Sequence, residues 1–366
     1  MGSYSDFEIN ILRVAQWVGI ASLALALLLS AVVLMLRAQL LLRERRHRKF
    51  LSFWQPILMN AVEVASSDVP QLSRRDLSNF LMLWNHLHEF LLDESKDHLN
   101  QIAYALSIDQ AALKMLRRGN LRERLMAIVT LGHLREQAAW DDLSQTTEGD
   151  DPFVSLAAAR ALVMIDARKA VPQLIPLLTS RGDWTAARVA SVLQTAGADV
   201  ISDPIARAAI AFSREQATTG ADHQAESINQ AARLVQYLEL AHDTSALPAA
   251  HAIAESSHDP EVLAGCLQLL SREEDLGIIR ECLSHEDWQV RVHAAAALGR
   301  VGEAEDEARL ITLLSDKEWW VRYRAAQALS QLPSMRGPRL AVIQTEQSTP
   351  FARDMLAQVI AEIELQ

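Results

Sequence analysis

The stretch that decides the fold is DWQVRVHAAAALGRVG, residues 287–302. A second stretch, EWWVRYRAAQALSQLP, occupies residues 318–333 and begins 31 residues later. A tryptophan, a Val-Arg pair, an Ala-Ala pair and an Ala-Leu pair stand at the same places in both. A sequence period of 20–50 residues is typical of proteins built from stacked structural repeats. The two stretches therefore predict a solenoid.

Further copies of the phrase extend the repeat in both directions. Arg291, Arg322 and Arg353 follow one another at intervals of 31 residues. Two copies depart from this arginine, because Ser155 and Leu263 stand in its place. The other copies, some of them weak, occupy residues 121–134, 152–165, 183–197, 226–240 and 259–271.

Each good copy predicts a pair of helices. The first helix of the strongest copy is expected at about 288–301, since Gly302 is a common residue just past a helix end. The second is expected in EDEARLITLLS, residues 305–315. One such hairpin cannot bury its apolar face alone, whereas stacked hairpins can. We expect an all-α solenoid over 120–366, and a helical N-terminal cap at 50–119, where helical patterns lack the phrase.

The phrase W-x-V-R-x-x-A-A-x-A-L-G resembles the HEAT-like, or PBS-lyase-type, repeats of bacterial proteins. The resemblance is closest at 287–332, good at 121–182 and faint at 200–280. Such repeats commonly place an acidic or amide residue at the turn before the first helix, and an arginine within it; Asp287 and Arg291 fit. The resemblance implies a HEAT-like α-solenoid of helical hairpins and a bacterial, membrane-anchored repeat protein.

Residues 14–36 predict one transmembrane helix. The segment, VAQWVGIASLALALLLSAVVLML, contains no charged residue, and about 20 apolar residues suffice to span a bilayer. A cleaved signal peptide has a shorter apolar region that follows positive charge, whereas here the positive charge comes afterwards. Residues 1–13 are then a short non-cytoplasmic N-terminus.

The basic juxtamembrane segment at 37–49 predicts the orientation. Six basic residues follow the span and one precedes it, and cytoplasmic flanks carry the excess of lysine and arginine. We expect a single-pass protein of the cell inner membrane, with its N-terminus outside and its solenoid in the cytoplasm. Besides setting topology, the segment is a candidate for contacting anionic lipid headgroups. The candidate residues are Arg43, Arg45, Arg46, Arg48 and Lys49.

Two further features, one within the span and one after it, are candidates for contacts in or at the membrane. Small residues step along one face of the predicted membrane helix, where they would let another helix approach closely. These residues are Ala15, Gly19, Ser22, Ala26 and Ser30. The aromatic segment KFLSFWQPILM, residues 49–59, lies either on the bilayer surface or in the first helix of the cap.

Composition argues against several classes of protein. The net charge is −11, and the residues after 49 carry −15, so a nucleic acid is a poor electrostatic match. Two cysteines without a CxxC pairing predict neither a disulfide framework nor a zinc site. No GxSxG, phosphate loop or GxGxxG motif is present, and His86 and His88 are spaced unfavourably for binding one metal ion. We expect no enzyme activity, cofactor, metal or small-molecule substrate.

The aromatic residues give the candidate contact site. Trp184, Trp288 and Trp319 stand at one repeat position and are expected to pack in the core. Trp320 stands where other copies have Gln289, Thr185 or Phe153, and a position that accepts the first two is expected to be partly exposed. The candidate partner-binding residues, which include the two neighbours one helical turn further on, are Trp320, Tyr323 and Arg324.

These features predict a non-catalytic, membrane-anchored scaffold or adaptor. It would bind a protein partner, itself a membrane protein or complex, and the resemblance extends this to complexes that build or export envelope glycans. Two alternatives stay open: a self-assembling structural membrane protein, and an enzyme of the HEAT-like lyase type. The recurrent arginines are expected to satisfy neighbouring carboxylates and turn carbonyls rather than to bind an anionic ligand.

Overall fold

The structure, a computed structural model, describes the backbone of residues 3–63, 69–91, 93–218, 221–335 and 339–365. Within these ranges some side chains lie outside the described residues, namely those of 3–16, 18–24, 26, 43, 62–63, 93–94, 215–218, 221–228 and 364. Every regular element in the described ranges is helical. The chain divides into two compact units, Met1–Thr130 and Leu131–Gln366.

The first unit is built around the end of one very long helix. Its helices are α1 (Ser3–Glu63), α2 (Leu77–Phe90), α3 (Asp93–Ala105), α4 (Ile108–Arg118) and the start of α5 (Leu121–Leu134). The C-terminal part of α1 contacts α2 and α3. Phe50, Trp54 and Leu58 are four residues apart on one face of α1 and are buried, as helical periodicity requires. Trp54 packs edge-on against Phe80, with ring centroids 5.0 Å apart.

This packing bears on the two interpretations of residues 49–59. Phe50 and Trp54 belong to the core of the first unit, whereas Phe53 and Met59 on the same helix are exposed. One face of the segment is therefore packed in the core of the first unit. Its exposed face leaves contact with a bilayer open.

Buried polar groups in the first unit are paired across helices. The indole nitrogen of Trp84 donates a hydrogen bond to the carbonyl of Leu99 at 3.1 Å. The Nε2 atom of His88 lies 2.9 Å from the amide oxygen of Asn100. Burial lowers the pKa of His88 to about 4, because a charged ring is costly away from water. His88 is thus a neutral core residue, while His86 is exposed beside Phe90.

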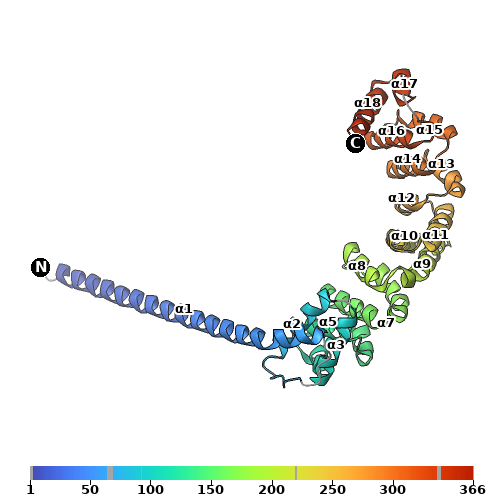
Figure 1. Ribbon diagram of the computed structural model, residues 1–366. Coiled ribbons are helices and arrows are strands. Elements are labelled where there is room, and N and C mark those ends of the chain that lie inside the picture. Colours follow the sequence, from blue (N-terminus) through green and yellow to red (C-terminus); the bar gives the residue numbers. More distant parts are fainter. Residues whose placement is uncertain (1–2, 64–68, 92, 219–220, 336–338, 366) are drawn as a thin grey trace. The chain divides into compact units, whose positions relative to one another are not determined.

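The second unit arranges its later helices in two rows (Figure 1). The first row comprises α8 (Ala186–Ala196), α10 (Ala221–Tyr237), α12 (Pro260–Leu269), α14 (Trp288–Val301), α16 (Trp319–Gln331) and α18 (Pro350–Glu364). The second row comprises α9 (Ala198–Thr218), α11 (Asp243–Ser256), α13 (Leu276–Cys282), α15 (Glu307–Leu313) and α17 (Arg339–Glu346). Helices α6 (Trp140–Thr147) and α7 (Pro152–Ser180) precede them, and single 3-10 turns precede several of the helices.

Contacts between neighbours make this unit a solenoid. Helix α14 packs between α12 and α16, and α16 also contacts α18. The second-row helices α11, α13, α15 and α17 each pack against the first-row helix that follows them in the chain. The alanine pairs of the repeat phrase are fully buried at this contact, as are Leu298 and Leu329. The predicted all-α solenoid is confirmed.

Small residues set the spacing of the first row. A Cβ atom added to Gly299 of α14 would lie 2.8 Å from the Cα atom of Ala328 in α16. No real Cβ approaches a backbone atom so closely, so α14 and α16 meet at a distance that only glycine permits. The Ala-Leu-Gly end of the phrase is therefore a packing requirement.

The repeat that begins at residue 152 forms two helical halves without an intervening loop. The backbone of Asp166 is extended, with φ −154° and ψ 95°, and it kinks α7 into two helical halves. Its carboxylate accepts a hydrogen bond from the amide of Lys169 at 3.1 Å, which caps the second half. One repeat is thus folded as two helices joined at a single residue.

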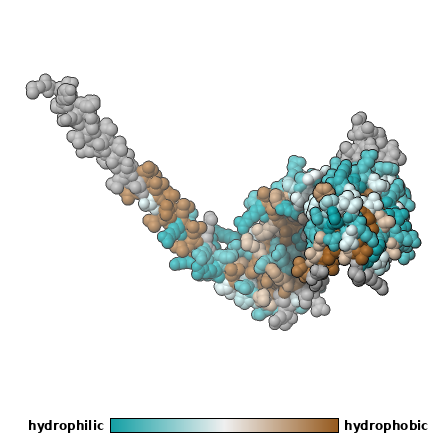
Figure 2. Space-filling model, turned by 90° about the horizontal axis from the view of Figure 1, so that it is seen from above, coloured by the Kyte–Doolittle hydropathy of each residue, from teal (hydrophilic) through white to brown (hydrophobic). Residues whose placement is uncertain are grey.

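The described part of α1 before the basic segment is apolar on its surface. Figure 2 shows this as a hydrophobic band, followed along the helix by a hydrophilic segment. The exposed apolar residues are Trp17, Leu25, Leu27, Leu28, Leu29, Val32, Val33, Leu34, Met35 and Leu36. Within the residues that the structure describes, no helix meets the length and hydropathy needed to cross a membrane. Eleven residues of the predicted span, 14–16, 18–24 and 26, lie outside the described side chains, and the span stays a prediction.

Candidate interaction surface

A buried arginine joins consecutive repeats at the start of the first-row helices. The guanidinium of Arg291 donates two hydrogen bonds to the carboxylate of Asp316, at 2.8 and 3.0 Å. It also donates to the carbonyls of His285 and Glu286, at 2.8 and 2.9 Å. Only 7% of Arg291 is exposed. This side chain therefore ties the turn before α14 to the turn before α16.

The next copy repeats half of this pattern. Arg322 donates to the carbonyls of Asp316 and Lys317, at 2.7 and 3.0 Å. Its guanidinium lies over the ring of Phe351, 5.4 Å from the centroid. Arg353, one repeat further on, is exposed. The expected structural role of the recurrent arginine is confirmed for Arg291 and Arg322.

In the copy that has Ser155 in place of the arginine, a neighbouring turn supplies one. Arg181 follows α7 and donates to the carbonyls of Thr147 and Gly149, at 3.2 and 2.8 Å, in the turn before Ser155. It also donates to the hydroxyl of Ser155 at 3.2 Å and to both carboxylate oxygens of Asp183. A guanidinium from the following turn thus occupies the place that the smaller serine leaves free.

The starts of three consecutive first-row helices expose aromatic rings. Trp288 and Trp319 are the first residues of α14 and α16, Trp320 is the second of α16, and Phe351 is the second of α18. All four side chains are exposed. Because α14, α16 and α18 pack side by side, their N-terminal ends form one border of the stack. With Tyr323, these four residues are called the aromatic edge.

Ring contacts hold the centre of the aromatic edge in place. Trp319 stacks on Tyr323 with centroids 5.1 Å apart and ring planes 14° from parallel. Trp320 meets Trp319 edge-on at 4.7 Å. The hydroxyl of Tyr323 donates to a carboxylate oxygen of Glu362 in α18 at 3.0 Å, and this hydrogen bond raises the pKa of Tyr323. The rings are therefore pre-positioned although they face solvent.

The three residues predicted to bind a partner lie together. Trp320 and Tyr323 have ring centroids 6.5 Å apart. Arg324 donates to the side-chain oxygen of Gln327 at 2.9 Å, and Gln327 donates in turn to the hydroxyl of Tyr323 at 2.9 Å. Arg324 is exposed. The structure thus places the predicted patch at the aromatic edge, with its guanidinium fixed beside the rings.

The expectation that Trp184, Trp288 and Trp319 share one packing position is wrong for two of them. Trp184 is 2% exposed, whereas Trp288 is 37% and Trp319 is 39% exposed. Trp184 precedes Thr185, the N-cap of α8, and its indole donates to Ser155 at 3.0 Å. The other two are the first residues of their helices. A shift of two residues relative to the helix start turns one indole inward and leaves the others outside.

The residues predicted for the membrane-proximal part are described only in part. Along α1 the side chains of Arg45, Arg46, Arg48 and Lys49 are exposed, and Arg48 pairs with Glu44. Of the small-residue face, Ser30 is exposed. The side chains of Ala15, Gly19, Ser22, Ala26 and Arg43 lie outside the described residues. Contacts of these groups with lipid or another helix stay predictions.

A comparison with protein families agrees with the repeat architecture. A family model described as HEAT repeats matches residues 110–194 and 276–359. Among solved structures, the chain is similar to the crystal structure of an engineered protein from a structural genomics consortium. That match has 17% identity over 84% of this chain and 88% of the other, with a TM-score of 0.36. A comparison with curated proteins finds no match.

The two matched blocks correspond to the parts of the chain where the repeat phrase is strongest. The first block begins at residue 110, within α4. This is ten residues before residue 120, the predicted start of the solenoid. The unmatched stretch between the blocks, 195–275, covers the faint copies. Residues 110–194 and 276–359 of this chain are therefore HEAT repeats.

Proposed function

We propose that this protein is a non-catalytic scaffold that binds a protein partner through the aromatic edge of its HEAT repeats. Stacked repeats offer extended surfaces for protein binding. The single observation that carries the proposal is the exposure of four large aromatic side chains at successive helix starts. Large apolar side chains gathered on a surface typically mark an interaction site.

The chemistry of the aromatic edge suits a binding hot spot. Tryptophan, tyrosine and arginine dominate the energetics of protein interfaces, and Trp320, Tyr323 and Arg324 supply one of each. Ring stacking and the hydrogen bond to Glu362 already restrict these side chains. Binding then loses little side-chain entropy, since pre-organised groups have less freedom to give up.

Replacing Trp320 by alanine should weaken partner binding by about 2 kcal/mol or more, roughly thirtyfold in Kd. The indole is 57% exposed, so its removal leaves no cavity and should hardly change the melting temperature. The measurement is the amount of partner that co-purifies with the full chain from a gentle detergent, together with a thermal melt. Val342→Ala, which alters an exposed residue of second-row helix α17, is the matched control. Melting of the Trp320 variant as severe as that of a core variant would show that the ring is structural.

We further propose that residues 14–36 anchor the scaffold in the cell inner membrane. The described residues 27–36 of α1 expose an almost continuous apolar surface, which is unfavourable in water. The exposed basic residues that follow would lie at the cytoplasmic headgroups. The N-terminus would then be outside, and the partner would be a membrane protein or complex. The narrower setting, a complex that builds or exports envelope glycans, rests on the sequence resemblance alone.

Fusing a topology reporter after Gln366 tests the anchor and its orientation. A reporter active only in the cytoplasm should give full signal, and one active only in the periplasm should give none, because six basic residues follow the span. Moving the positive charge to the N-terminal side, by Arg43→Glu, Arg45→Glu and Arg46→Glu with added N-terminal lysines, should reduce this asymmetry. A periplasmic signal from the unaltered chain would overturn the orientation. Recovery of the chain in the soluble fraction after lysis would overturn the anchor.

A further inference from the structure

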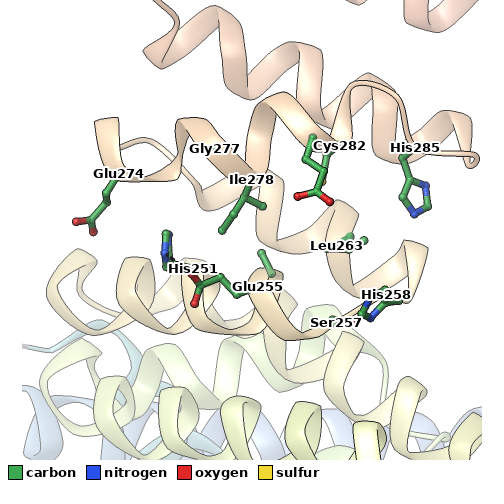
Figure 3. Close-up of a pocket in the computed structure, with 12 residues that line it drawn as sticks. His251, Glu255, Ser257, His258, Leu263, Glu274, Gly277, Ile278, Cys282 and His285 are labelled. Carbon is green, nitrogen blue, oxygen red and sulfur yellow. Dashed lines mark ion pairs between the residues drawn. The ribbon is translucent and has the colours of Figure 1, made fainter.

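An open pocket lies between the second-row helices α11 and α13 (Figure 3). Its volume is about 650 Å³, within the range of pockets that take small ligands or peptide side chains. Figure 3 shows His251 and Glu255 on one wall and Glu274, Gly277 and Ile278 on the other. Leu263 and Cys282 also line it.

At this pocket, a histidine takes the place of the arginine that pairs with the buried aspartate of the next repeat. Asp275 and Asp306 are buried carboxylates, 31 residues apart, in the turns before α13 and α15. Asp306 accepts two hydrogen bonds from the guanidinium of Arg280, at 2.8 and 2.9 Å. Asp275 instead lies 2.6 Å from Nδ1 of His251. An imidazole reaches less far than a guanidinium, so it fills less of the gap between the helices.

Two further replacements on α13 enlarge the same gap. Gly277 stands where the next repeat has Ala308, and a Cβ atom added to it would meet nothing within 4 Å. Ile278 stands where the next repeat has Arg309, whose guanidinium lies 3.2 Å from Asp306. Two guanidinium groups, those of Arg280 and Arg309, therefore contact Asp306, whereas the residues in the corresponding places beside Asp275, His251 and Ile278, supply none.

The lining of the pocket combines an apolar base with an acidic rim. Ala254, Leu263 and Cys282 are buried at its base. Burial raises the pKa of the Cys282 thiol to about 11, so this cysteine is a neutral part of the base. Glu255, Glu274 and Glu281 are exposed around it.

The rim of the pocket has more carboxylates than positively charged groups, even after its ion pairs are counted. Arg272 pairs with Glu274 and lies 3.6 Å from Asp275. His251 lies 3.4 Å from Glu255 through its Nε2 atom. Four carboxylates, including Asp275, face one guanidinium and the imidazole of His251. The pocket thus has fewer guanidinium groups beside its buried aspartate than the next repeat has beside Asp306.

We propose that this pocket docks a basic segment of a protein partner, with a lysine or arginine next to an apolar side chain. The aliphatic stem of such a residue can lie against Leu263 and Ile278 while its charge meets the glutamates. Charge complementarity of this kind selects partners and steers their approach. The pocket and the aromatic edge share no residue, so this proposal does not depend on the one above.

The test selects a displayed library of random 12-residue peptides against the full chain in detergent. Peptides are kept only if they bind the native chain at least tenfold more tightly than Gly277→Trp, in which an indole occupies the pocket. We expect the retained peptides to be enriched in lysine or arginine beside leucine, isoleucine or methionine. No peptide that depends on the open pocket, or an enrichment of acidic peptides, would overturn the proposal.

Matched variants separate pocket binding from changes in folding. Ala308→Trp adds the same ring at the equivalent place in the next repeat, and it should leave binding of the retained peptides unchanged. Glu274→Gln with Glu281→Gln should weaken them at least tenfold while leaving the melting temperature unaltered. A synthetic peptide of the chain's own residues 37–49 is the final probe. If it binds the pocket more tightly than every selected peptide, the occupant is this chain itself and not a partner.

Discussion

Replacing Arg291 by alanine is expected to lower the free energy of unfolding of the C-terminal repeats by about 3–5 kcal/mol, the usual loss when one partner of a buried ion pair is removed. The substitution leaves the carboxylate of Asp316, itself largely buried, without its two strongest hydrogen bonds. It also strips the carbonyls of His285 and Glu286 of their donor. Urea unfolding followed by tryptophan fluorescence measures the loss.

Two controls isolate the paired geometry from the charge alone. Arg291→Lys keeps the charge but cannot form the two-pronged contact with Asp316, so it should recover only part of the lost stability. Asp316→Asn combined with Arg291→Ala completes a double-mutant cycle, which should show a coupling well above 1 kcal/mol. If Arg291→Ala costs less than about 1 kcal/mol, the turn-to-turn tie contributes little to the stack.

Leu298→Ala is expected to cost about 2–5 kcal/mol, the range found for removing a buried leucine side chain. Leu298 is fully buried in α14, where α12, α13 and α16 surround the helix. The rigid spacing set by Gly299 and Ala328 limits collapse into the cavity. Leu329→Ala, one repeat later and equally buried, should behave alike.

The comparison variant for this prediction is Leu365→Ala, because Leu365 is 88% exposed and its truncation should change stability by less than about 0.5 kcal/mol. Each repeat contacts only its neighbours, so loss of stability should be local. Hydrogen exchange should therefore accelerate in α12 to α16 and much less in α2 to α4. Uniform acceleration over the whole chain would contradict a stack of semi-independent repeats.

Much of this fold could be predicted from the sequence because the residues that recur in each repeat are those that pack between helices. Close contact between helices requires the alanine pairs, the leucine that follows them and the glycine of α14. The recurrence of such residues therefore predicts stacked helices. The recurrent arginine is also predictable, because a guanidinium at a fixed repeat position meets the same turn carbonyls each time. Where the copies are faint, at 226–240, the pattern of helices persists in α10 without the phrase.

Other features depend on geometry that a one-dimensional pattern does not contain. Ser155 signals a missing arginine, but only the fold shows Arg181 reaching back from the following turn. Trp184 and Trp288 look equivalent because each follows the aspartate that opens its copy of the phrase, yet they differ by two residues relative to the helix start. The pocket beside His251 is equally hidden, since it arises from several small replacements at positions far apart in the chain. A hint lies in the pair Gly277 and Ile278, which break the pattern set by Ala308 and Arg309.

Photo-cross-linking from position 320 is the most direct measurement of whether the aromatic edge binds a partner. Trp320 is replaced by the photoreactive amino acid p-benzoylphenylalanine in the full chain, and the same replacement at Val342 in α17 is the reference. Irradiation of intact membranes should link the first variant to one protein of defined mass, while the second should give no such adduct. Equal adducts from both positions, or none from position 320 in a folded chain, would contradict a partner-binding aromatic edge.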